Sequence, residues 1–111
     1  MNLYKITIVY VNMWHDLDPP EDVTYYEHCI GQSHATRLFD GFVSVTKSGG
    51  VLDLAAEAYE TDQGREVPKV DAFCVKMIRL SAATLKEGSE ANWNWETISE
   101  ETFEPDWDAI L

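Results

Sequence analysis

Two segments near the start of the chain show the alternation of apolar and polar residues that is typical of β-strands. Residues 3–11, LYKITIVYV, are rich in β-branched and aromatic side chains, and Lys5 and Thr7 mark one face. Residues 22–31 alternate in the same way, with Val23, Tyr25, Glu27 and Cys29 on one face and Thr24, Tyr26, His28 and Ile30 on the other. Pro19 and Pro20 end the first segment in an acidic loop, so we predict an antiparallel pair.

The pattern changes to helical spacing after Ser33. The apolar residues that follow it at this spacing are Ala35, Leu38, Phe39, Phe42 and Val43. Ser33 is placed as an N-cap, and Gly49 and Gly50 lie beyond the end. Because β-branched residues weaken the helical pattern after position 42, we predict a helix over 33–41. A hairpin between residues 43–46 and 51–54 is the alternative.

The middle of the chain contains one ambiguous segment and one clear strand. Residues 51–59, VLDLAAEAY, fit a helix or a strand, and their alanine content favours a helix. Residues 70–80 are apolar on both faces, as in a central strand. Together these elements predict an α+β domain with a small, mostly antiparallel sheet of three or more strands and one or two helices.

After Ser81 the chain becomes more acidic and carries several large aromatic residues. Residues 1–80 hold 12 acids and 7 bases, whereas residues 81–111 hold 8 acids and a single base. The same segment contains Trp93, Trp95, Phe103 and Trp107, whose large rings favour packing against the domain at least as far as Trp95. We therefore predict a compact domain over residues 1–98. An acidic, aromatic C-terminal segment follows over 99–111, whose order could depend on a partner.

The whole chain has 111 residues and a net charge of −12, which argues against direct contact with nucleic acid or an anionic membrane. No apolar run approaches the ~18 residues of a membrane span, and the first residues do not have the pattern of a secretory signal. We expect a cytoplasmic protein. Cys29 and Cys74 are too few for a disulfide scaffold, so buried thiols are expected, with a single bridge between neighbouring strands as the alternative.

The sequence has no pattern that indicates catalysis, a metal or a cofactor. One candidate metal site is His28 and Cys29 with His34, but His28 and Cys29 would point to opposite faces of a strand. The other is His15 with Asp16 and Asp18, and neither set has the spacing of a zinc site. Phosphate-binding glycine loops and a G-x-S-x-G elbow are also absent from the sequence. We predict a protein without enzymatic activity. The competing hypothesis is a small enzyme that uses His28, Ser33 or His34.

The acidic C-terminus contains the one group of residues that indicates a binding site. If residues 96–104 are helical, Glu96, Glu100 and Glu104 lie on one face, with their carboxylates about 6 Å apart. Such like charges repel, so we expect them to face a basic surface, and tryptophan is frequent at binding hot spots. The predicted partner-binding residues are Glu96, Glu100, Glu101, Glu104, Asp106, Trp107 and Asp108. The alternative is an acidic face that is only solvated.

In size and sign of charge, the chain resembles the small acidic inhibitors, many of them encoded by bacteriophages, that occupy the basic clefts of DNA-binding enzymes. The resemblance implies a DNA mimic that docks on a basic, nucleic-acid-binding protein, and it assigns no individual residues. The alternative hypothesis is a structural or assembly subunit that self-associates through a sheet edge or the aromatic tail.

Overall fold

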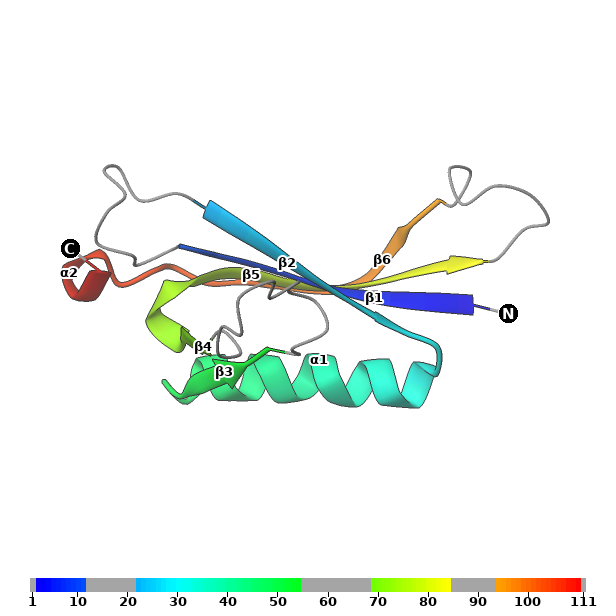
Figure 1. Cartoon of the computed structure of the whole chain (residues 1–111), viewed down its shortest axis with the longest axis horizontal. Helices are drawn as coiled ribbons and strands as arrows, with labels where there is room; N and C mark the ends of the chain where they lie inside the picture. The colour runs from blue at the N-terminus through cyan, green and yellow to red at the C-terminus, as the bar shows by residue number, and fades with distance from the viewer. Residues whose placement is uncertain (1, 12–21, 55–68, 85–93, 111) are drawn as a thin grey trace, which may run out of the picture.

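A four-stranded antiparallel sheet with a long helix on one face dominates the computed structural model, which describes residues 2–11, 22–54, 69–84 and 94–110 (Figure 1). The elements in chain order are β1 (Asn2–Val11), β2 (Asp22–Cys29), α1 (Gln32–Lys47), β3 (Val51–Asp53), β4 (Lys69–Asp71), the 3-10 helix η2 (Ala72–Cys74), β5 (Val75–Thr84), β6 (Glu96–Thr102) and α2 (Trp107–Ile110). The predicted α+β class is confirmed.

The strand order in the large sheet is β2-β1-β5-β6, and every neighbouring pair is antiparallel. β1 pairs with β2 from Tyr4 opposite Cys29 to Val11 opposite Asp22, which confirms the predicted antiparallel pair. The predicted central strand over 70–80 is divided between two sheets. Its first residues form β4, η2 then turns the chain, and β5 enters the large sheet at Val75.

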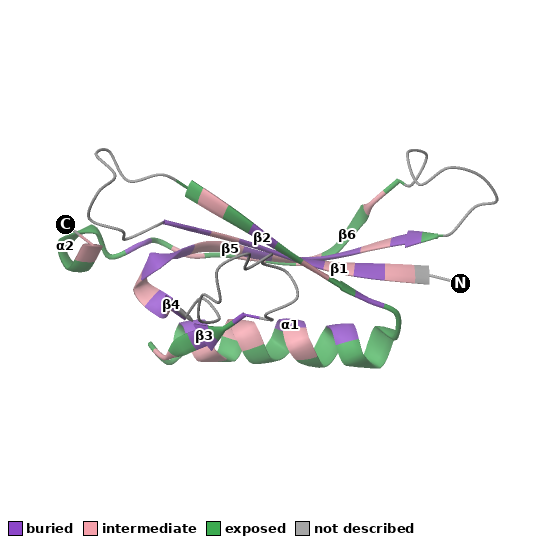
Figure 2. Ribbon diagram, in the orientation of Figure 1, coloured by how far each residue is buried: buried purple, intermediate pink, exposed green. Residues whose placement is uncertain are grey.

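The core lies between the large sheet and α1. Side chains at even positions of β1 face the helix, and Ile6 and Ile8 are fully buried in one cluster with Ala35 and Phe39 of α1 and Ile78 of β5. Figure 2 shows buried positions on the strands of the large sheet and on α1. Full burial of an isoleucine side chain contributes about 1.5–3 kcal/mol relative to its exposed state. The sheet therefore has one apolar face under α1 and a second face that no described helix covers.

Helix α1 is longer than predicted and ends at Lys47 instead of residue 41. Packing against the sheet outweighs the low helix propensity of its β-branched residues, and the Thr46 hydroxyl donates a hydrogen bond of 2.8 Å to the Phe42 carbonyl. The N-cap is Gly31 and no side chain caps the helix, so the N-cap prediction for Ser33 is wrong. The hairpin alternative is also wrong, because residues 43–46 are helical.

The helix predicted over 51–59 is wrong at its start, because Val51–Asp53 form a strand that pairs with β4. Leu52 and Leu54 are buried while Val51 and Asp53 are exposed, which is the alternation of a strand with one buried face. Residues 55–59 lie outside the described residues.

The C-terminal segment continues the same fold. β6 pairs with β5 from Glu96 to Thr102 and so crosses the predicted division between residues 98 and 99. Beyond β6, the Phe103 amide donates a hydrogen bond of 2.9 Å to the Lys76 carbonyl, and the Asp106 amide donates one of 2.9 Å to the Phe73 carbonyl. Residues 103–106 are thus held along β5 and η2.

Cys29 and Cys74 are buried free thiols, as predicted, and no disulfide joins them. Within the ranges that the structure describes, no helix is both long enough and apolar enough to span a membrane.

Candidate functional site

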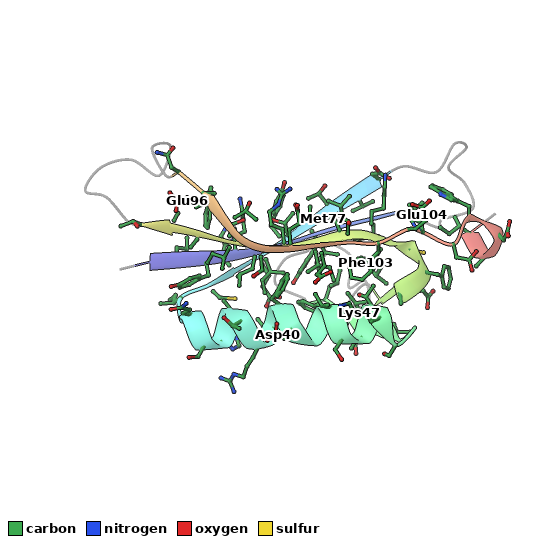
Figure 3. All side chains as sticks on the ribbon, turned by 180° about the vertical axis from the view of Figure 1, so that it is seen from behind. Asp40, Lys47, Met77, Glu96, Phe103 and Glu104 are labelled. Carbon is green, nitrogen blue, oxygen red and sulfur yellow. The ribbon has the colours of Figure 1, made fainter. Side chains whose placement is uncertain are left out.

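The predicted row of carboxylates is not helical. Residues 96–102 form an extended edge strand, so Glu96 and Glu104 are separated by about 26 Å of chain instead of the about 12 Å of a helix. Figure 3 shows the two glutamates well apart along this part of the chain. The register also divides the row, because Glu96 lies opposite Ala82 on the α1 side of the sheet, whereas Glu100 lies opposite Arg79 on the other side. The single-faced arrangement predicted from helical spacing is therefore wrong.

Two of the predicted partner-binding glutamates are engaged inside the fold. Arg79 donates hydrogen bonds from Nε and Nη2 to Glu100 Oε1, at 2.8 and 2.6 Å. Lys47 Nζ on α1 lies 4.0 Å from Glu101 Oε1. Exposed pairs of this kind contribute little to stability, in the range of about 0–1 kcal/mol, but they reduce the charge available to a partner. Glu100 and Glu101 are thus weaker candidates than the sequence suggested.

The remaining candidates gather after β6, in a group that we call the C-terminal acidic patch: Glu104, Asp106, Trp107 and Asp108. All four residues are exposed, and Trp107 keeps 41% of its surface accessible. No described Lys, Arg or His side chain lies within ion-pair distance of the three carboxylates. The patch therefore combines an exposed indole with acidic charge that no described base neutralises.

The patch is held in place by backbone contacts and by its apolar neighbours. Phe103 and Ile110, on either side of it, pack against the core, and Pro105 is buried. Asp106 lies directly before α2: its carbonyl accepts hydrogen bonds from the amides of Ala109 and Ile110, and its Oδ1 accepts one of 3.3 Å from the Ala109 amide. Trp107 is thereby presented on a short helical turn that is fixed to the domain.

A second cluster lies on the sheet face opposite α1. Lys5 Nζ lies 4.2 Å from the centroid of the Trp95 ring and 5.3 Å from that of the Tyr26 ring. The His28 and Trp95 ring centroids are 5.9 Å apart. Burial, and then the positive charge of Arg79, lower the pKa of Lys5. These contacts attach the start of β6 to β1 and β2 through cation–π and ring contacts.

The strand alternation predicted part of this second cluster. Tyr26 and His28 share one face as expected, and the register places His28 directly opposite Lys5. Nothing in the sequence pattern identified Trp95 as a member of this cluster, because its position depends on how β6 enters the sheet beside β5.

The residues of the enzyme hypothesis are not brought together. Ser33 and His34 are exposed on the first turn of α1, whereas His28 lies on the sheet face away from that helix. Burial and the nearby Glu27 raise the pKa of Cys29, and burial and Asp71 raise the pKa of Cys74 to about 11. Neither thiol is activated as a nucleophile.

The described residues contain no group of three side chains suited to hold a metal ion. His15, Asp16 and Asp18 of the second metal candidate lie outside the described residues. Comparisons with protein-family models, with curated proteins and with solved structures found no match to this chain.

Proposed function

We propose that this protein is a non-enzymatic interaction protein that docks on a basic surface of a partner protein through the C-terminal acidic patch. One observation carries the proposal: Trp107 is exposed on a fixed turn, between carboxylates that have no described basic neighbour. Tryptophan is enriched among the residues that dominate binding energy, and the accessible 41% of the Trp107 surface is available to a partner.

The fixed turn favours this function over a purely solubilising role. A flexible acidic tail loses conformational entropy when it binds, whereas Trp107 and its neighbours are already ordered by Pro105, Phe103 and the Asp106–Phe73 hydrogen bond. The net charge of −12 adds long-range attraction towards a positively charged partner and repulsion of nucleic acid. The three carboxylates supply short-range contacts to lysine and arginine.

The partner class follows from the same charges. A protein surface that is basic enough to attract this patch is typical of a nucleic-acid-binding protein, whose lysines and arginines ordinarily contact phosphates. Docking of the patch would occupy those side chains and compete with the nucleic acid. The proposed consequence is inhibition by charge mimicry.

The test is a pull-down from lysate of the cells that naturally produce the protein, at about 50 and about 500 mM salt, with three forms of the protein as baits. The baits are the natural chain, an E104Q/D108N variant, and a D40N/D53N control that loses the same two charges from exposed positions on α1 and β3. We expect a basic protein to be retained at low salt by the natural chain and the control, and to be lost from the patch variant. Equal retention by the two variants would contradict a specific role of the patch.

A further inference from the structure

The two outer strands of the large sheet differ in how well they are protected against pairing with another strand. β6 carries three glutamates and an irregular register, in which Ile98 has no direct partner on β5. Charges and bulges of this kind are common devices that prevent edge-to-edge association. β2 is eight residues long and pairs with β1 without a break in register. Its other edge has no strand partner among the described strands.

Exposed apolar side chains coincide with the unprotected edge. Tyr26, at the middle of β2, is 49% exposed, and Ile30, just after the strand, is 72% exposed. A regular strand edge that no described strand pairs with, and that has exposed apolar residues, is a template for pairing with a further strand.

We propose that two copies of this chain associate through their β2 strands, antiparallel about a twofold axis that passes beside Tyr26. The strand that pairs with the outer edge of β2 is the β2 strand of a second copy, because β2 is complementary to itself in an antiparallel pair. In this register Tyr26 lies opposite Tyr26 of the second copy, Thr24 lies opposite His28, and Tyr25 lies opposite Glu27. Aromatic cross-strand pairs are favourable, and no like charges face each other.

Neighbouring registers are less favourable. Residues that lie opposite each other must be on the same face of the combined sheet, so the register can change only in steps that preserve the faces. One such step places Glu27 opposite Glu27 of the second copy, which is repulsive. The step in the other direction places the exposed Tyr26 ring opposite Thr24 and pairs Tyr25 with Tyr25 instead, but the Tyr25 ring is only 2% exposed and already lies in the core.

Pairing in the proposed register would produce a continuous eight-stranded sheet with both α1 helices on one face. The clusters of Lys5, Tyr26, His28 and Trp95 from the two copies would then lie on the other face, on either side of the axis. This inference is independent of the proposed function, and its salt dependence is opposite. Salt screens the repulsion between two chains of charge −12 and strengthens the dimer, whereas it weakens docking on a basic partner.

The first test is sedimentation of the whole chain from about 10 µM to about 1 mM, the range in which a small interface is populated. We expect a monomer–dimer equilibrium that shifts towards the dimer at about 500 mM salt. Y26D should abolish the dimer, and the matched I98D should retain it, because Ile98 is also 49% exposed but lies on β6. A monomer at every concentration and salt, or a dimer that survives Y26D, would overturn the proposal.

Crosslinking tests the register even if Y26D destabilises the fold. A Y26C chain should form a disulfide-linked dimer under mild oxidation, whereas I98C should stay monomeric. The natural Cys29 and Cys74 are buried with raised pKa values and should not compete. Equal crosslinking of the two variants, or none in Y26C, would show that Tyr26 does not lie at the axis.

Discussion

Replacement of Phe103 by alanine should release the C-terminal acidic patch from the domain. Phe103 is partly buried and packs against the core, at the point where the chain leaves β6 (Figure 3). Truncation of a fully buried phenylalanine costs about 3–5 kcal/mol, so partial burial predicts a loss of about 2 kcal/mol in the free energy of unfolding. For a chain of 111 residues, this loss should lower the melting temperature by about 9 °C.

Urea unfolding measures this loss, and hydrogen exchange of residues 103–110 reports where it acts. The control is Trp107→Ala, which removes a larger ring four residues later. Because Trp107 keeps 41% of its surface accessible and is not among the side chains that pack against the core, we expect a smaller loss than in Phe103→Ala. Equal losses in the two variants, or unchanged exchange in Phe103→Ala, would refute the conclusion that Phe103 fixes the patch.

Three further predictions concern the fold. Ile8→Ala, at a fully buried position of β1, should lower the free energy of unfolding by about 2–5 kcal/mol in urea titrations, and a loss below about 1 kcal/mol would contradict the described core. Gly41→Ala should stabilise the protein by about 0.5–1 kcal/mol, because it lies within α1 in open space, whereas Gly49→Ala should destabilise it by a similar amount since its φ is 77°. The free energy of unfolding should fall as the pH rises from about 9 towards 11, because the Cys74 thiol loses its proton at lower pH in the unfolded chain than in the folded protein. Cys74→Ala should reduce this pH dependence. An unchanged pH profile in that variant would argue against the raised pKa of Cys74.

The first half of the fold could be predicted because its signals are local. Alternation fixed the faces of β1 and β2, and helical spacing located the start of α1. The end of α1 could not be predicted in this way. Its last turns contain Val43 and Val45, whose low helix propensity is outweighed by packing against the core.

The candidate site was harder to predict, because its geometry depends on contacts between distant parts of the chain. Glutamates have a low β-propensity, and the spacing of Glu96, Glu100 and Glu104 matches a helix, yet pairing with β5 makes the segment a strand. The ion pair between Arg79 and Glu100 is equally non-local. The sequence did identify Glu104, Asp106, Trp107 and Asp108 as candidates, and the structure shows them exposed. Their role in binding stays a prediction.

The proposed docking is tested most directly by the dissociation constant of the purified complex with the captured basic partner, measured by calorimetry across salt concentrations. We predict that affinity falls steeply between about 50 and about 500 mM salt. Trp107→Ala should weaken binding by about 2 kcal/mol, which is about thirtyfold. E104Q/D108N should weaken it much more than D40N/D53N. Binding that is independent of salt, or equally weakened by both double variants, would contradict docking through the C-terminal acidic patch.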